Sequence, residues 1–244
     1  MNDEHKDITK YIYHDNIGRV QLVQHWGNDQ TIVNSARVSF GQHNQSEELS
    51  DRDKKLIKYL IKHRHTSTLE HCGATFLFVV PLFVARQHHR HRTWSYNEIS
   101  RRYTDVDIKF YSPQAFRTQH ESNRQASNAN QLIDPIIDTP DGKYNAKSAS
   151  CLMDQYHQRA LNLFESMIAA GVCREQARGI LPQNMYCEYY GSVNLNNLLK
   201  FIDLRTHEGA QWEIQQVAKA MLEILEPLFP VAVEAWREKN NEQG

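Results

Sequence analysis

The most unusual chemistry in the chain lies in residues 86–103, RQHHRHRTWSYNEISRRY, which carry five arginines and one acid. The whole chain has a formal net charge of only -1, so this positive charge is local. Arginine forks bind phosphate through two parallel hydrogen bonds, each contributing about 1.5–3 kcal/mol. A solvated helix face more often mixes lysine with glutamate. The segment therefore predicts a site for an anion.

Two kinds of anion site fit these residues. One is a site for single-stranded nucleic acid, in which arginines hold phosphates and aromatic rings stack on bases. The other is a nucleotide pocket, in which the same residue types line a concave site. The interspersed Ser95, Asn97, Glu98 and Ser100 favour the pocket, because their polar groups can recognise a sugar or a base edge. Composition by itself leaves the two hypotheses nearly even.

A second cluster, HRHTSTLEH at residues 63–71, holds three histidines and a glutamate. Imidazole and carboxylate are ligands for zinc or iron, so a metal site through His63, His65 and His71 is one hypothesis. The cluster lacks the HExxH spacing of a metal-binding helix, and its Thr, Ser and Thr indicate a turn. We favour a cofactor-binding loop and expect no metal, with ordinary surface histidines as the other possibility.

A third candidate is Arg205, which ends a helical pattern before Gly209 in the segment FIDLRTHEGAQWEIQQ. An arginine at such a break can point into a cleft. A surface salt bridge at the helix end is the commoner arrangement, and the sequence leaves both open.

The elements that position these residues follow from hydrophobic periodicity and from capping signals, such as Ser50 with an acidic residue three positions later. Strands are predicted at 20–23, 72–80 and 184–193, and helices at 29–40, 50–63, 151–171, 194–204, 210–226 and 230–238. Pro81 opens a further helix through residue 92, so that a buried strand passes directly into the basic segment. Residues 117–147 lack periodicity and predict a long surface excursion. We expect an α+β fold in which a small twisted sheet is covered by helices, in a single domain over residues 1–244.

Net charge, the distribution of apolar residues and the cysteine spacing limit the classes of protein to which the chain can belong. The near-neutral charge gives no global reason to expect nucleic acid or a membrane as partner. The first residues are polar and no apolar run approaches about 18 residues, so we expect a cytoplasmic protein. The four cysteines form no CxxC pair, which predicts reduced and mostly buried thiols.

Taken together, these segments resemble the flavin-dependent thymidylate synthases. The family motif, RHR, two residues, S, one residue, NE, one residue, S, one residue, RY, is complete at residues 90–103. The resemblance extends to ARVSF, HRHTSTLEH, FVARQ, REQARGILPQNMY and LRTHEGAQWEIQQ, in the family's order over nearly the whole chain.

The resemblance implies methylation of dUMP to dTMP, with 5,10-methylenetetrahydrofolate as carbon donor, FAD as redox carrier and NADPH as reductant. It also implies a homotetramer in which several subunits build each active site. Arg205 matches an arginine that favours ionisation of the uracil N3–H, which makes it the catalytic candidate. The resemblance assigns dUMP binding to Gln87, Arg90, Glu98, Ser100, Arg102, Arg178 and Arg205.

The resemblance assigns FAD binding to His65, Ser67, Glu70, Arg90, His91, Arg92, Glu98, Asn194, Asn196 and Lys200. The chain departs from the family's pattern at Asn196, where relatives often have arginine, at Lys200, where they have an amide, and at Gly209, where many have histidine. Ser100 has no histidine partner evident in the sequence, so we assign it to substrate binding and not to nucleophilic attack.

Overall fold

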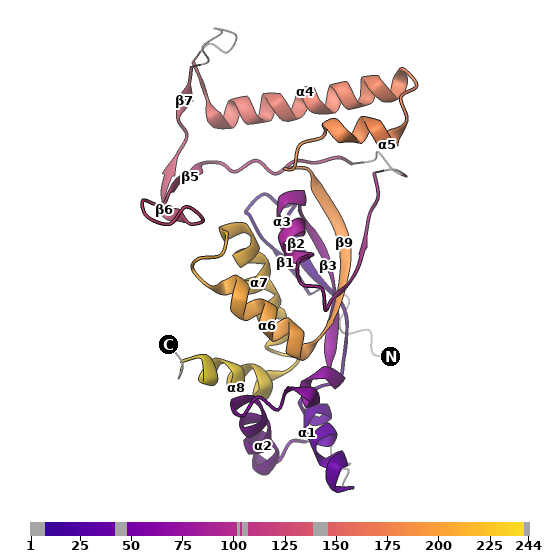
Figure 1. The fold of residues 1–244 in the computed structure, drawn as a ribbon, viewed down its shortest axis with the longest axis vertical. Coiled ribbons are helices and arrows are strands. Elements are labelled where there is room, and N and C mark those ends of the chain that lie inside the picture. Colours follow the sequence, from indigo (N-terminus) through magenta and orange to yellow (C-terminus); the bar gives the residue numbers. More distant parts are fainter. Residues whose placement is uncertain (1–7, 42–47, 102, 104–106, 139–145, 242–244) are drawn as a thin grey trace.

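The centre of the protein is a five-stranded antiparallel sheet with strand order β1-β2-β3-β9-β4 (Figure 1). The structure is a computed structural model that describes residues 8–41, 48–101, 103, 107–138 and 146–241. The five strands are Thr9–Tyr11 (β1), Arg19–Trp26 (β2), Gly73–Pro81 (β3), Ser95–Glu98 (β4) and Tyr186–Asn194 (β9). The predicted α+β fold, a small sheet covered by helices, is confirmed.

Strand β3 is the middle strand and is buried along almost its whole length. It pairs with β9 without interruption, so that Phe78 lies opposite Tyr189 and their rings stack with centroids 5.1 Å apart. At Gly73 an added Cβ would lie 2.2 Å from the Trp26 ring, so the close pairing of β2 with β3 requires a glycine there.

Two C-terminal helices, Leu195–Thr206 (α6) and Trp212–Leu225 (α7), pack against the sheet, and the last helix, Pro230–Asn241 (α8), packs against helices of the N-terminal half. On α7, buried apolar residues recur at helical spacing, as in Ile214, Val217, Met221 and Ile224. The start of α8 is capped from far away in the sequence, because the Asp29 carboxylate accepts from the backbone N–H groups of residues 231 and 232 at 2.9 and 3.1 Å.

Two helices from the N-terminal half, Asp29–Arg37 (α1) and Asp51–Lys62 (α2), lie at one end of the molecule beside α8 (Figure 1). The predicted cap of α2 is confirmed. Ser50 Oγ accepts from the Asp53 N–H at 3.3 Å, and the Asp53 carboxylate accepts from the Ser50 N–H at 3.0 Å.

The helix predicted to run from Pro81 through residue 92 is wrong beyond His88. The helix Leu82–His88 (α3) ends there, and a turn leads into β4. The Tyr96 hydroxyl donates to the backbone carbonyls of His88 and His91, at 2.9 and 3.2 Å, and β4 pairs with β9. The pairing of β4 with β9 at the sheet edge thus takes precedence over the helical pattern of the sequence after His88.

The excursion at 117–147 contains strands that the sequence did not indicate. Phe116–Gln119 (β5) pairs with Ser127–Ile133 (β6), and Ile136–Ile137 (β7) pairs with Lys147–Ser148 (β8). Three of these strands have four residues or fewer, and β6 is mostly exposed. Neither feature produces the alternation of polar and apolar residues that predicts a strand from sequence.

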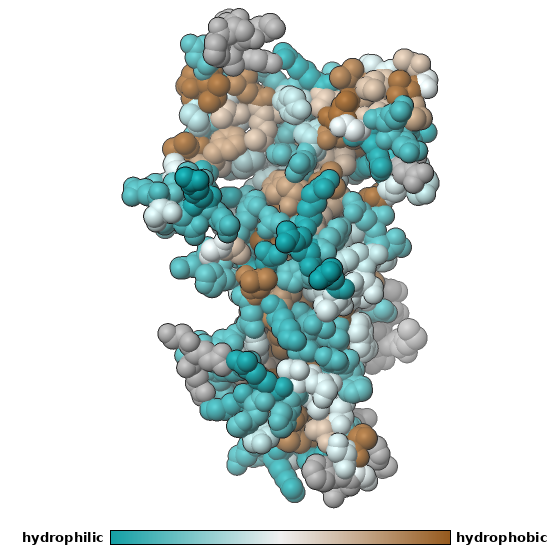
Figure 2. Space-filling view, viewed as in Figure 1, coloured by the Kyte–Doolittle hydropathy of each residue, from teal (hydrophilic) through white to brown (hydrophobic). Residues whose placement is uncertain are grey.

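The long helix Ala149–Ala169 (α4) and the short helix Arg174–Ala177 (α5) lie apart from the sheet (Figure 1). Tyr156 and Leu163 of α4 are 58% and 53% exposed. Figure 2 shows hydrophobic residues gathered over α4 and β7 at this end of the molecule. An apolar helix face is therefore left open to solvent in the single chain.

Two further expectations from the sequence concern membrane-spanning helices and the burial of the cysteines. None of the helices in the described part of the chain is long and apolar enough to cross a membrane. Cys72 and Cys187 are buried, but Cys151 and Cys173 are exposed, so the expectation that most thiols are buried is wrong for half of them.

Candidate active site

A cleft of about 750 Å³ opens beside the basic segment, and three arginines line it. We call it the arginine cleft. Its walls come from α3, the turn after it, the end of α6 and the loop of the β5–β6 hairpin. The lining residues are Arg86, Gln87, Arg90, His91, Gln125, Leu204 and Arg205. Four residues that the sequence assigned to nucleotide or flavin binding therefore meet in one cleft: Gln87, Arg90, His91 and Arg205.

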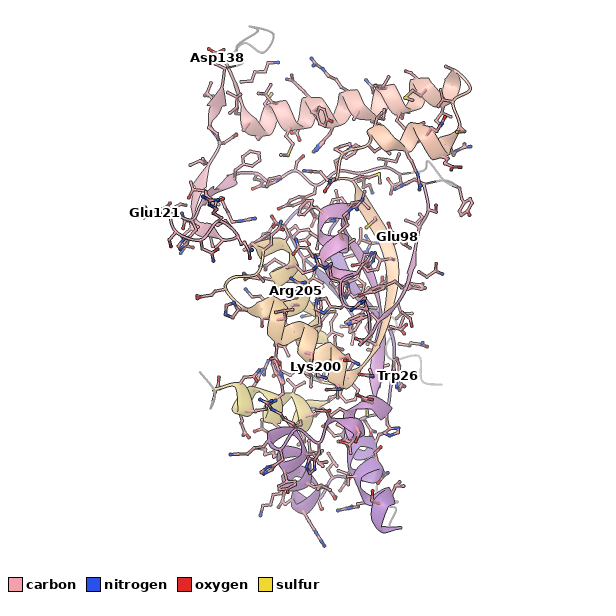
Figure 3. All side chains as sticks on the ribbon, in the orientation of Figure 1. Trp26, Glu98, Glu121, Asp138, Lys200 and Arg205 are labelled. Atoms are coloured by element: carbon pink, nitrogen blue, oxygen red, sulfur yellow. The ribbon has the colours of Figure 1, made fainter. Side chains whose placement is uncertain are left out.

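Arg205 is held in this cleft by hydrogen bonds to the basic segment. Its Nε donates to His91 Nε2 at 3.1 Å, and its Nη2 donates to the Gln87 carbonyl at 3.3 Å. Loss of solvation and the nearby charge of Arg90 lower the pKa of Arg205, yet arginine stays protonated at neutral pH. The helix end thus presents a fixed cation to the cleft (Figure 3).

His91 is a neutral partner for this cation. Burial, and then the charge of Arg205, lower the pKa of His91 to about 4. Because Arg205 can only donate, His91 Nε2 must accept and the ring proton must sit on Nδ1.

His88, the last residue of α3, anchors the turn that follows this helix in the core. Its ring is fully buried among aromatic side chains that include Phe78, Trp94 and Phe201, and its Nδ1 lies 2.8 Å from the Tyr189 hydroxyl. Burial holds the pKa of His88 well below its ordinary value. This histidine is therefore a neutral part of the core that fixes where the cleft residues 90 and 91 lie.

Gln87 is fixed by a relay of side chains that sequence analysis missed. Its amide donates to Gln211 Oε1, and the Gln211 amide donates to Glu213 Oε2 at 2.9 Å. Glu213 is buried and accepts two hydrogen bonds from Arg117 Nη2, at 2.7 and 3.0 Å. Both Gln211 and Glu213 belong to the AQWE stretch that carried the resemblance, and no signal in the sequence linked them to Gln87 or to the excursion.

Other residues assigned to dUMP do not line the arginine cleft. Glu98 lies on the edge strand β4, Ser100 follows it, and Arg178 lies in the 3₁₀ turn after α5 (Figure 3 labels Glu98). Loss of solvation raises the pKa of Glu98, and the charge of Arg86 partly opposes this, so Glu98 lies within electrostatic reach of the cleft. Arg92 is exposed on the turn, and Arg102 lies outside the described residues.

A second pocket, of about 830 Å³, lies between α1, α2 and the 3₁₀ turn Thr66–His71. We call it the loop pocket. It brings His65 and Ser67 together with Ser35, Ser39 and Arg64. Ser39 and Arg64 lie in stretches that carried the resemblance, but the sequence assigned no role to these last three residues. The His63 ring lies 4.2 Å from the ring of Tyr59, centroid to centroid, so the histidines of this cluster pack beside an aromatic side chain. Among the described residues, no group of three or more His, Cys, Asp or Glu side chains is placed to hold a metal ion.

A smaller pocket of about 300 Å³ adjoins the loop pocket, and Arg64 and Thr66 line both. Asn196 and Lys200 line it as well, and Asn196 Nδ2 donates to Glu70 Oε1 at 2.9 Å. Asn194 is the N-cap of α6 and accepts from the Asn197 N–H at 2.9 Å. Helix α6 therefore carries Lys200 at one pocket and Arg205 at the arginine cleft, and five residues of helix separate them by about 7.5 Å along its axis.

The sequence model of the family described as "Thymidylate synthase complementing protein" matches residues 21–231. A flavin-dependent thymidylate synthase from Thermus thermophilus is 41% identical over 221 residues, which cover 91% of this chain and 76% of that protein. One from Wolbachia pipientis wMel is 35% identical over 243 residues, covering 98% and 78%.

A solved structure shares the fold. The UMP/dUMP methylase PolB from Streptomyces cacaoi, crystallised with 5-Br dUMP, has a TM-score of 0.74 and 32% identity, covering 90% of this chain and 94% of that one. Together with the complete motif at residues 90–103, these matches show that the chain belongs to the family of thymidylate synthase complementing proteins, the flavin-dependent thymidylate synthases, and is an enzyme of that kind.

Proposed function

We propose that the enzyme converts dUMP to dTMP, with a bound flavin as redox cofactor, 5,10-methylenetetrahydrofolate as carbon donor and NADPH as reductant. The observation that carries this proposal is the arginine cleft, where the guanidinium groups of Arg86, Arg90 and Arg205 meet from three stretches that resemble the family. The relative PolB is a UMP/dUMP methylase crystallised with a brominated dUMP, and its match over 90% of this chain supports dUMP as the substrate.

The cleft suits a nucleotide monophosphate whose base becomes anionic. Arg90, with Arg86 beside it, provides forks for the phosphate. Arg205 is the cation that we assign to the uracil ring, where it favours loss of the N3 proton and stabilises the resulting anion. Its hydrogen bonds to His91 and to the Gln87 carbonyl orient the guanidinium before substrate arrives. We further assign Glu98, Ser100, Arg102 and Arg178 to dUMP, as the resemblance to the family implies.

The loop pocket and its neighbour suit a flavin. Hydroxyls of Ser35, Ser39 and Ser67, the imidazole of His65 and the guanidinium of Arg64 provide the mixed donors that a dinucleotide needs, beside the ring of Tyr59. We assign FAD to these pockets. The residues that we propose to bind it there are His65, Ser67, Glu70, Asn194, Asn196 and Lys200. We propose that Arg90, His91, Arg92 and Glu98 of the motif also contact FAD. When bound, the flavin passes reducing equivalents from NADPH to the nucleotide, and the protein binds, orients and excludes water.

We propose that a homotetramer completes each active site. Arg178 and Ser100 do not line the arginine cleft, although the resemblance to the family assigns both to the same substrate. The exposed apolar face of α4 offers a surface that a second copy can cover.

The test begins with the visible absorption spectrum of the purified protein, followed by anaerobic addition of NADPH with and without dUMP. We expect the band of oxidised flavin, bleached by NADPH, and dTMP as the product once methylenetetrahydrofolate is added. A colourless protein that also fails to take up FAD would overturn the proposal. Activity that a chelator leaves unchanged would exclude the metal hypothesis for the histidine cluster.

A further inference from the structure

We propose that Gln125, in the loop of the β5–β6 hairpin, contacts the neutral part of the nucleotide in the arginine cleft. The inference rests on the proposed function, because it assumes that dUMP occupies that cleft. Gln125 belongs to the excursion, a segment to which neither the sequence nor the family motif gave a role. Gln125 nevertheless lines the cleft together with Arg90 and Arg205.

The first strand of this hairpin, β5, is bound to Glu213, a member of the hydrogen-bonded relay that positions Gln87. Arg117 on β5 forms a largely buried ion pair with Glu213, with N to O distances of 2.7 and 3.0 Å. The Arg117 guanidinium also lies 5.2 Å from the centroid of the Trp212 ring, and its Nε donates to Ser127 Oγ on β6 at 2.9 Å. One arginine thus joins both strands of the hairpin to the start of α7.

The loop of the hairpin is also ordered by its own hydrogen bonds. The Gln119 amide donates to the carbonyls of Asn123 and Ala126 at 3.1 and 2.9 Å. The backbone N–H of Gln125 donates to Asn123 Oδ1 at 3.0 Å. Because the backbone at Gln125 is held in this way, its side chain enters the cleft at little further entropic cost.

The chemistry of the amide indicates which part of the nucleotide it meets. The three arginines already supply donors and charge for the anionic groups. An amide is neutral and both donates and accepts, which suits a uracil carbonyl or a sugar hydroxyl. Gln125 then fixes the orientation of the nucleotide without altering the charge balance of the cleft.

The experiment measures equilibrium binding of dUMP and of inorganic phosphate to the wild-type enzyme and to Gln125→Ala, Gln125→Glu and Glu121→Gln. For Gln125→Ala we expect a loss of about threefold to tenfold in dUMP affinity, the value of one neutral hydrogen bond, with phosphate binding unchanged. Gln125→Glu should lose more, because its carboxylate repels an anionic ligand. Glu121, on the same hairpin but outside the cleft, is the matched control and should leave both affinities unchanged (Figure 3).

A double-mutant cycle tests the anchoring by Arg117. If Arg117→Met frees the hairpin, a further Gln125→Ala change should cause little additional loss of dUMP affinity, so the two effects are not additive. Thermal unfolding of each variant confirms that it is folded.

The outcomes separate the inference from the proposed function. A wild-type enzyme that does not bind dUMP would overturn both. Wild-type binding that both Gln125 variants retain in full would overturn the role of Gln125 alone. Equal losses of phosphate and dUMP affinity in Gln125→Ala would place the amide at the phosphate and overturn its assignment to the neutral part.

Discussion

Arg205 donates a hydrogen bond from its Nε to His91 Nε2 across 3.1 Å, although the two residues are 114 positions apart in the sequence. The sequence left open whether Arg205 forms a surface salt bridge or points into a cleft. It lines the arginine cleft, and its hydrogen bonds go to an imidazole and a backbone carbonyl. The positive charge therefore stays available to a bound anion.

We expect Arg205→Ala to reduce turnover at saturating dUMP by about a hundredfold or more, the effect of losing one preorganised donor to a developing anion. Flavin should remain bound, because the loop pocket does not include this residue. Steady-state dTMP formation and the flavin spectrum are the measurements. Arg205→Lys is the conservative variant: it restores charge but not the fork, and should recover part of the rate. Wild-type turnover by Arg205→Ala would remove the catalytic role.

The lowered pKa values of His88 and His91 lead us to expect that the folded protein loses stability in mild acid. The folded-state pKa of His88 lies well below 6.5 and that of His91 is about 4, so both stay neutral in the folded protein. Below pH 6.5 the unfolded chain binds protons that the folded chain does not, and the free energy of unfolding falls as the pH falls from 6.5 toward 4. Each such histidine contributes at most about 1.4 kcal/mol per pH unit.

The measurement for this prediction is urea unfolding between pH 4 and pH 7, on the wild type and on His88→Phe. Phenylalanine fits the aromatic surroundings of His88 but cannot be protonated. It leaves the Tyr189 hydroxyl without its partner, which lowers stability at every pH, so the slope against pH is the informative quantity. An identical slope in both proteins would show that His88 does not contribute to the acid sensitivity.

Much of the fold could be predicted from the sequence, because local signals and burial agree in those elements. The capping box at Ser50 and the apolar run of β3 led directly to the observed helix and strand. The motif at residues 90–103 predicted a site in the basic segment, and Gln87, Arg90, His91 and Arg205 do meet in one cleft.

The remaining features depend on contacts between distant segments. The helical pattern after Pro81 gave no sign that β4 would pair with β9, because that strand lies about 90 residues further along the chain. In the same way, the sequence around Arg117 is polar and suggests an exposed side chain. In the structure, Glu213, 96 positions away, accepts a hydrogen bond from it. The role of the excursion therefore had no local signal in the sequence.

Ser100 provides a test of whether the enzyme uses a nucleophile. We expect Ser100→Ala to weaken dUMP binding by about threefold to tenfold while leaving measurable turnover, because the proposed role of its hydroxyl is a single hydrogen bond to substrate. The measurement is the change in KM against the change in kcat. Thr93→Ala, at an exposed position of the same segment outside the fixed letters of the motif, is the control. Complete inactivity at saturating dUMP, with the fold intact, would reopen the nucleophile hypothesis.

Glu213 is the residue of the relay whose loss should be most damaging to the fold. Its buried carboxylate accepts from Arg117, Gln211 and Tyr111, and its backbone carbonyl accepts from the Tyr13 hydroxyl at 3.0 Å. Glu213→Ala removes the negative charge but leaves the Arg117 guanidinium largely buried, an arrangement that costs about 3–5 kcal/mol in other proteins. Glu213→Gln keeps the shape and one acceptor, so it should lose less.

Glu223, on the same helix, is the matched control because it pairs with Lys10 at the surface, where both side chains are about half exposed. Its replacement by alanine should change the free energy of unfolding by less than about 1 kcal/mol. Urea denaturation at one protein concentration and with equal flavin loading compares the variants. The relay also orients Gln87, so Glu213→Gln should weaken dUMP binding even where the fold survives. If Glu213→Ala were no less stable than Glu223→Ala, the ion pair with Arg117 would not hold the hairpin against α7.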